Sequence, residues 1–258
     1  MQTATSESTI VIAEIGVNHN GALSLAKDLV VRAKEAGADY AKFQTFTAAD
    51  LVVRDAELAA YQQGAVRSGR QLELLASLAL TRSDFEELVR YCSHVGIGFL
   101  TTAHDLQSAQ FVFDLGSEFI KIPSGDITNY PFLELVAQQK SHVLLSTGAS
   151  QFSDVVAAIE VLEQQGLPRS EITVMQCTTE YPAPLNEANL RAMVQMGIAC
   201  GVAVGYSDHT LGQDSAIAAV ALGATVIEKH ITLDRGLVGP DHAASLEPAE
   251  FKSMVDAI

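Results

Sequence analysis

The stretch AAVALGATVIEKHIT, residues 218–232, joins an amphipathic segment to a short apolar run through a single glycine. A glycine that follows a helix commonly adopts the left-handed conformation that ends it. An apolar run that is rich in β-branched residues and bounded by small ones is typical of a buried parallel strand. The stretch therefore predicts a helix, a turn at Gly223 and a buried strand that ends at His230.

The same unit recurs, and apolar runs of this kind are spread along the whole chain. It reads VVRAKEAGADYAKFQTF at 30–46, LVRYCSHVGIGFLTTA at 88–103 and VFDLGSEFIKIPSG at 112–125. We predict eight strands, at residues 9–16, 39–46, 98–103, 119–125, 142–148, 172–179, 203–210 and 225–232. Helical patterns separate them, at 22–36, 83–95, 105–115, 131–139, 153–165, 186–196, 211–222 and after Pro248.

Eight strands that alternate with eight helices over about 250 residues are typical of a (β/α)8 TIM barrel. The alternative is a doubly wound open sheet, which usually carries a GxGxxG turn after its first strand. The sequence has no such turn. We therefore expect one α/β domain, a barrel over residues 9–258 that follows a polar tail at 1–8. We expect the long connection at 47–82 to form a lid or a partly helical insert.

The composition excludes several classes of partner. The chain has 258 residues, with 16 Lys+Arg against 31 Asp+Glu and a net charge of -15. Nucleic acids and anionic membranes both need basic patches, so we expect neither as a partner. The three cysteines lack CxxC spacing, which indicates a reduced, cytoplasmic setting rather than a disulfide scaffold. No signal peptide or membrane span is visible, so we expect a soluble protein.

Every predicted strand ends in polar or charged residues. They are Glu14, Lys42 with Gln44, Thr101 with Thr102, Lys121 with Ser124, Ser146 with Thr147, the run 176–180, Ser207 with Asp208 and His209, and Glu228 with His230. Any one of them could be an ordinary residue of a strand-to-loop junction. Because TIM barrels keep their active sites at the carboxyl ends of the strands, the whole set predicts a polar mouth there.

Two histidines in this mouth are candidate metal ligands. His209 ends the seventh strand and His230 ends the eighth, and neighbouring strands lie about 4.8 Å apart. Two imidazoles at matching heights could therefore bind one metal ion, although a core histidine and a loop histidine are the alternative. Two protein ligands would leave open positions for substrate, which suits Lewis-acid catalysis.

Two lysines predict an anion site in the same mouth. Lys42 and Lys121 end the second and fourth strands, close to serine and threonine hydroxyls, as expected for a phosphate or carboxylate site. The alternative for Lys121 is a stem that packs on the outside of the barrel with its ammonium in water. The other histidines are weaker candidates, although His19 and His242 lie in loops of the mouth and could touch substrate.

Nine motifs are similar, in the same order, to those of the N-acetylneuraminate (sialic acid) synthase family, with its legionaminate and pseudaminate synthase relatives. The resemblance runs from Ile10 to the end of the chain. The motifs are AEIGVNHNG (13–21), AKFQTF (41–46), FLTTAHD (99–105), IKIPSGDITNYP (120–131), LSTGA (145–149), QCTTEYPAP (176–184), GYSDHT (205–210), ALGATVIEKH (221–230) and GPDHAASLEP (239–248).

The resemblance implies a transferase that forms a carbon–carbon bond. Members of the family condense phosphoenolpyruvate with an N-acetylated hexose, here N-acetylmannosamine or a diacetamido-sugar. The products are a nine-carbon sialic-type keto acid and phosphate. A divalent metal takes part, most often Mn²⁺, with Mg²⁺ or Co²⁺ as alternatives. The resemblance also implies that this chain could assemble as a homodimer.

The resemblance implies roles for individual residues of this sequence. His209 and His230 match the metal ligands, and the expected catalytic residues are Glu14, Lys121 and Asp126. The positions that match substrate-binding residues are Lys42, Gln44, Thr102, Ser124, Thr179, Tyr181, Ser207 and Asp241.

Three departures from the family pattern bear on the substrate. Some relatives carry Asn at the position of Thr179 and Glu at that of Asp126, which leaves the sugar preference open. Ala243 stands where many relatives have lysine. Family members usually continue into a small C-terminal antifreeze-like domain, and because the sequence ends at Ile258 we expect that domain to be absent.

Two other functions stay open at this point. One is a barrel lyase or isomerase that uses Lys121 as a Schiff base, which borohydride would trap with a carbonyl substrate. The other is a barrel-only binding or regulatory homologue with little turnover.

Overall fold

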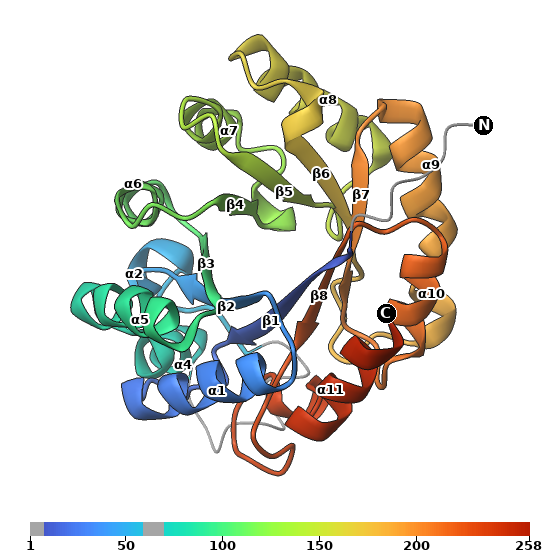
Figure 1. Cartoon of the computed structure of the whole chain (residues 1–258). Coiled ribbons are helices and arrows are strands. Elements are labelled where there is room, and N and C mark those ends of the chain that lie inside the picture. Colours follow the sequence, from blue (N-terminus) through green and yellow to red (C-terminus); the bar gives the residue numbers. More distant parts are fainter. Residues whose placement is uncertain (1–7, 59–69) are drawn as a thin grey trace.

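A computed structural model describes residues 8–58 and 70–258, and within them eight parallel strands close into a barrel (Figure 1). Each strand is paired with its neighbour in the chain, and β8 pairs with β1. The strands are β1 (Ile10–Gly16), β2 (Tyr40–Thr45), β3 (Gly98–Ala103), β4 (Phe119–Ile122), β5 (His142–Ser146), β6 (Ile172–Gln176), β7 (Ala203–Asp208) and β8 (Val226–His230). The predicted (β/α)8 barrel is confirmed.

Helices surround the barrel and follow the predicted order (Figure 1). They are α1 (Leu23–Glu35), α5 (Arg82–Val95), α6 (Leu106–Asp114), α7 (Tyr130–Ala137), α8 (Phe152–Gln164), α9 (Leu190–Cys200), α10 (Asp214–Ala221) and α11 (Pro248–Ala257). Local sequence sets their ends. The Thr81 hydroxyl accepts a hydrogen bond from the Asp84 backbone N–H at the start of α5, and Gly223 after α10 has the expected positive φ of 99°.

Two connections differ from simple loops. The predicted helix at 186–196 is displaced, because Asn189 adopts a left-handed conformation (φ 50°) and α9 begins only after it. In the long connection, α2 (Ala48–Leu51) and α4 (Gln71–Leu78) confirm a partly helical insert. Residues 59–69 of that connection lie outside the described residues, and a lid remains a prediction.

The inside of the barrel changes character from one end to the other. At the amino-terminal end the inward-facing side chains form an apolar cluster of Ile12, Leu100, Phe119, Leu144, Met175 and Val226. Side chains two positions apart on a strand share a face. Two residues further along five of these strands stand the inward-facing Glu14, Thr102, Lys121, Ser146 and Glu228. Strand alternation therefore places a polar site directly on an apolar floor.

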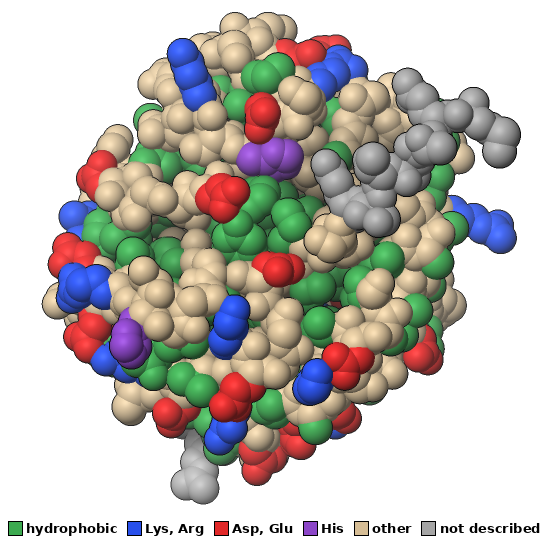
Figure 2. All heavy atoms as spheres, viewed as in Figure 1, with side chains coloured by type: hydrophobic (Ala, Val, Ile, Leu, Met, Phe, Trp, Pro, Cys, Tyr) green, Lys and Arg blue, Asp and Glu red, His purple; other side chains and the backbone are tan. Residues whose placement is uncertain are grey.

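The surface carries charged side chains of both signs (Figure 2). On the face shown in Figure 2, acidic and basic side chains are intermixed around hydrophobic ones near the centre. Among the described residues, no helix combines the length and the apolar character needed to cross a membrane.

Candidate active site

A polar pocket opens at the carboxyl ends of the strands, where the sequence predicts the active site. Its lining residues are Glu14, Lys42, Gln44, Thr102, His104, Lys121, Pro123, Ser124, Ser146, Cys177, Thr179, Tyr181, Ser207, His209, Glu228 and His230. All of the predicted site residues except Asp126 and Asp241 are among them. Closure of the barrel therefore brings together residues that are up to 216 positions apart, from Glu14 to His230.

Lys42 and Lys121 point into the barrel, where they form a chain of buried ion pairs. Lys42 Nζ lies 2.6 Å from Glu14 Oε2 and 3.7 Å from Glu228 Oε2. Lys121 Nζ donates to both carboxylate oxygens of Glu228, at 2.9 and 2.8 Å. All four side chains are at most 6% exposed. Lys121 therefore belongs to the pocket and does not lie on the outside of the barrel.

The ion pairs set the charges of the two carboxyl groups differently. Burial raises the pKa of Glu14, and the charge of Lys42 only partly offsets it. Burial would also raise the pKa of Glu228, but the charges of Lys121 and Lys42 and their hydrogen bonds hold it well below its ordinary value. Glu228 is thus a permanent anion between two lysines, whereas Glu14 takes up a proton more readily.

Hydroxyl and amide groups complete the polar lining. Lys42 Nζ donates to Thr102 Oγ1 at 3.0 Å, and Gln44 Nε2 donates to Glu14 Oε1 at 3.1 Å. Ser207 Oγ donates to Glu228 Oε1 at 2.8 Å. These bonds hold both lysines and both carboxylates in one geometry before any ligand arrives.

His209 and His230 lie side by side at the mouth, with ring centroids 5.9 Å apart. His209 Nδ1–H donates to the Thr178 carbonyl at 2.5 Å, which leaves Nε2 as an acceptor for the Tyr181 hydroxyl at 3.0 Å. Burial lowers the pKa of His209 to about 4 and that of His230 well below its ordinary value. Both rings are therefore neutral at pH 7, the form in which imidazole binds a metal.

His230 has a second feature that suits a ligand. Its Nδ1 atom is buried and has no hydrogen-bond partner among the described residues, and it lies 4.0 Å from Asp241 Oδ2. The described part of the chain contains no ready-made group of three or more metal-ligating side chains. The donor set fits a divalent cation that is held by two imidazoles and keeps open positions for other ligands.

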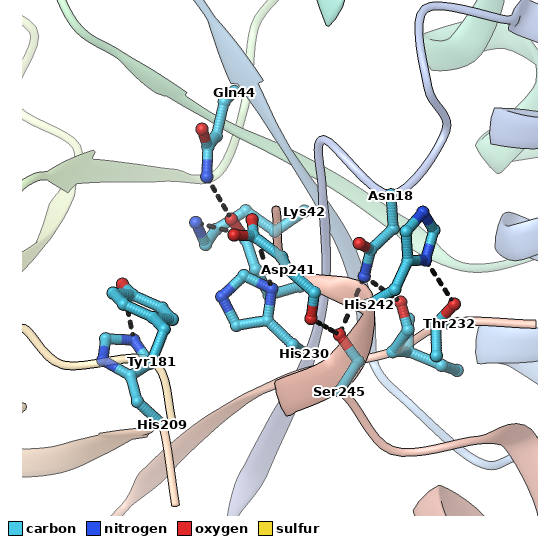
Figure 3. A network of polar contacts seen from close by, with 12 residues as sticks. Asn18, Lys42, Gln44, Tyr181, His209, His230, Thr232, Asp241, His242 and Ser245 are labelled. Carbon is cyan, nitrogen blue, oxygen red and sulfur yellow. Dashed lines mark hydrogen bonds and ion pairs between the residues drawn. The ribbon is translucent and has the colours of Figure 1, made fainter. Parts of the chain in front are cut away.

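The loop that carries Asp241 is fastened to the barrel by a buried polar network (Figure 3). Asn18 Nδ2 donates to the Ile231 carbonyl and to Ser245 Oγ, both at 2.9 Å. Ser245 Oγ in turn donates to the backbone carbonyl of Asp241 at 2.7 Å. Burial, with a smaller contribution from the charge of Glu14, raises the pKa of Asp241 to about 7. Asp241 thus lies beside His230, in a cavity that adjoins the main pocket.

Asp126 is the predicted site residue that the structure brings neither into the pocket nor into the adjoining cavity. It lies in a 3-10 turn, η1 (Ser124–Asp126), half-buried, and accepts a hydrogen bond from Asn129 Nδ2 at 3.0 Å. His19 and His242 are buried but are not among the residues that line the pocket.

Glu228 and His104 are the main pocket residues to which the sequence analysis gave no role. Glu228 contacts both lysines and Ser207, and its position two residues before His230 was the signal that it shares the face of a candidate ligand. His104 follows β3 and carried no such signal. Ser146 and Cys177 also line the pocket.

Comparison with known proteins points to a single family. The sequence pattern of the NeuB family matches residues 29–258. The chain is 46% identical over 253 residues to the N,N'-diacetyllegionaminic acid synthase of Campylobacter jejuni, covering 98% of this chain and 76% of the relative. It is 44% identical over 257 residues to the N,N'-diacetyllegionaminic acid synthase of Legionella pneumophila, covering 98% and 72%.

A solved structure is also similar. The N-acetylneuraminic acid (sialic acid) synthetase of Leptospira borgpetersenii, crystallised with citrate, superposes with a TM-score of 0.85 at 30% identity. The match covers 96% of this chain and 82% of that one.

Proposed function

This chain belongs to the NeuB family, and we propose that it condenses phosphoenolpyruvate with a hexose that carries two acetamido groups. The products are a nine-carbon sialic-type keto acid and phosphate. The identity to two diacetyllegionaminic acid synthases, 46% and 44%, supports the diacetamido-sugar over N-acetylmannosamine, because the sialic acid synthetase of known structure is only 30% identical.

The observation that supports the proposal most strongly is that two buried lysines and two neutral imidazoles line one pocket. Phosphoenolpyruvate carries a phosphate and a carboxylate, and Lys42 and Lys121 are placed to bind these two groups. Ser124 and Thr102 also line the pocket and supply hydroxyl groups, with Thr102 Oγ1 3.0 Å from Lys42 Nζ. The acceptor sugar then lies on the side of His209 and His230.

A divalent cation held by His209 and His230, with Mn²⁺ as the first candidate, would polarise the aldehyde oxygen of the acceptor sugar. The enol carbon of phosphoenolpyruvate attacks the aldehyde carbon, and positive charge develops on the carbon that bears the phosphate. The electron pair of the carbonyl bond moves to the aldehyde oxygen, which becomes a hydroxyl group by taking a proton from solvent. Glu14 and Glu228 stabilise that charge. Water adds to the same carbon, and the raised pKa of Glu14 makes it the base that takes up the proton of this water. Phosphate then leaves by cleavage of its bond to carbon, with Lys42 and Lys121 neutralising it.

The structure argues against the Schiff-base alternative. Lys121 Nζ donates both of its hydrogen bonds to the buried carboxylate of Glu228, so its ammonium is one half of an ion pair. A Schiff base needs a free amine at this position.

Exhaustive chelation should abolish turnover, and Mn²⁺ should restore it. We expect His209→Ala and His230→Ala each to lower turnover at least about a hundredfold. Mutation of a residue that only hydrogen-bonds to a metal ligand already lowers metal affinity or activity about ten- to a hundredfold. Calorimetric titration with Mn²⁺ measures the lost affinity directly. The control is His94→Ala on the exposed face of α5, which should leave both values unchanged. Full activity after chelation would contradict the assignment.

A further inference from the structure

We propose that the cavity beside the main pocket, bounded by His104 and by leucines of α2 and α4, binds the second acetamido group of the acceptor sugar, the group that a hexose with a single acetamido group lacks. His104 Nε2–H donates to the amide carbonyl, and the leucines pack against the methyl group. The inference rests on the proposed function and names which part of the chain selects the sugar.

The two spaces differ in size. The main pocket has a volume of about 100 Å³, whereas the adjoining cavity has about 430 Å³. Gln44, His104, Tyr181 and His230 line both, so the two spaces meet beside His230, one of the two proposed metal ligands. A sugar whose aldehyde lies at His209 and His230 therefore extends into the larger cavity, while phosphoenolpyruvate stays with the lysines.

His104 stands at the junction of the two spaces with its ring fixed in place. The backbone N–H of His104 donates to the Thr45 carbonyl at 3.2 Å, and its ring lies edge-on to Phe46, so the side chain is held in place. Its Nε2 atom is nevertheless buried and has no hydrogen-bond partner among the described residues. An unpaired buried polar atom destabilises a fold, so its presence at the junction of two cavities points to a ligand that supplies the partner.

The chemistry of His104 favours a neutral ligand group. Burial and the charge of Lys42 together lower the pKa of His104 to about 4, so the ring is uncharged at pH 7. A neutral imidazole can donate one hydrogen bond through Nε2–H. An amide carbonyl is a matching acceptor, whereas the anionic groups of phosphoenolpyruvate are matched by the lysines.

The walls of the cavity match the rest of an acetamido-sugar. One wall is apolar and consists of Val17, Leu51, Val52, Leu74, Leu75 and Leu78. The lining also includes Gln44, Gln71 and Asp241, whose polar groups suit sugar hydroxyls. None of the described lining residues is a lysine or an arginine, so these side chains offer no cationic partner for an anionic group. Together these side chains match a ligand that has an apolar methyl group and several hydroxyl groups, as an N-acetylated sugar does.

The test compares His104→Phe, which keeps a flat ring but removes the donor, with His104→Gln, which keeps an amide donor. The substrates are hexoses that differ only in carrying two acetamido groups or one. We expect His104→Phe to raise the KM of the diacetamido-hexose about 10- to 100-fold, the usual effect of losing one good hydrogen bond. Calorimetric affinity for phosphoenolpyruvate should stay within about twofold, since the lysines are untouched.

Two variants, His104→Gln and Leu75→Gln, separate a binding role of His104 and the cavity from a structural one. His104→Gln should restore most of the sugar affinity, which mere packing of the ring would not require. Leu75→Gln, at a half-buried position on the apolar wall, should narrow the preference for two acetamido groups over one. His94→Phe on the surface of α5 is the control and should change nothing.

The outcomes distinguish this inference from the proposed function. If the unaltered protein releases phosphate but His104→Phe leaves the sugar KM unchanged, or weakens phosphoenolpyruvate binding instead, the acetamido site is wrong and the function stands. If the unaltered protein shows no phosphoenolpyruvate-dependent phosphate release with any of the sugars, both are overturned.

Discussion

Lys121→Met is expected to lower turnover by about 10²- to 10³-fold, which corresponds to the ~2.7–4 kcal/mol that one preorganised donor contributes in the transition state. Methionine preserves the length and much of the apolar stem of lysine, so the barrel interior remains filled. The ammonium that we assign to phosphoenolpyruvate is lost. The measurement is the initial rate of phosphate release at saturating sugar, together with calorimetric affinity for phosphoenolpyruvate.

A second variant separates lost chemistry from a disturbed fold. Lys121→Met leaves the Glu228 carboxylate buried with Lys42 at 3.7 Å and Ser207 at 2.8 Å. Adding Glu228→Gln removes that uncompensated charge, so the double variant should regain stability but not turnover. The exposed Lys252→Met on α11 is the matched control. Turnover of Lys121→Met within about tenfold of the unaltered protein would show that Lys121 does not bind the anion.

Lys229→Met is expected to lower the free energy of unfolding by about 3–5 kcal/mol, the usual cost of removing one partner of a buried ion pair. Lys229 and Asp208 are both fully buried, with Nζ and Oδ2 2.8 Å apart, and Lys229 also donates to the Thr210 carbonyl at 2.5 Å. The pair joins β7 to β8 on the side of the sheet that faces away from the pocket. It lies directly beside His209 and His230 in the chain, so its loss should also loosen the two candidate ligands.

The control for this prediction is an ion pair of the same length. Lys252 and Asp256 lie 2.8 Å apart, but they are 55% and 62% exposed and four residues apart on α11. Lys252→Met should cost at most about 1 kcal/mol, because solvent screens the pair. Both variants are compared by chemical denaturation, with Asp208→Asn/Lys229→Met as the double variant that should recover part of the loss. Equal costs for Lys229→Met and Lys252→Met would contradict the prediction.

Strand alternation explains why most of the site could be predicted from the sequence. A residue at the carboxyl end of a barrel strand that shares a face with apolar core residues must point into the mouth, as Lys42 and Lys121 do. This reasoning does not apply to Asp126, which follows Pro123. It lies in a 3-10 turn, where side chains no longer alternate between two faces. The displaced start of α9 has a similar local cause, the left-handed Asn189.

The contacts across the barrel could not be predicted in the same way. Glu228 lies 107 residues from Lys121 in the chain, and their ion pair depends on how far the closed barrel brings β4 and β8 together. The cavity beside His104 depends on where the connection between β2 and α5 folds back, because its leucines belong to α2 and α4. Periodicity within a segment carries no information on either distance.

The most direct test of the proposed reaction follows the bridging oxygen of phosphoenolpyruvate. Phosphoenolpyruvate labelled with ¹⁸O at that position is incubated with the protein, Mn²⁺ and a hexose that carries two acetamido groups, and the products are weighed by mass spectrometry. Water attack at the phosphate-bearing carbon predicts that the label leaves with inorganic phosphate and that a nine-carbon keto acid forms without it. Label retained in the keto acid would mean attack at phosphorus, and the absence of any keto acid would contradict the condensation itself.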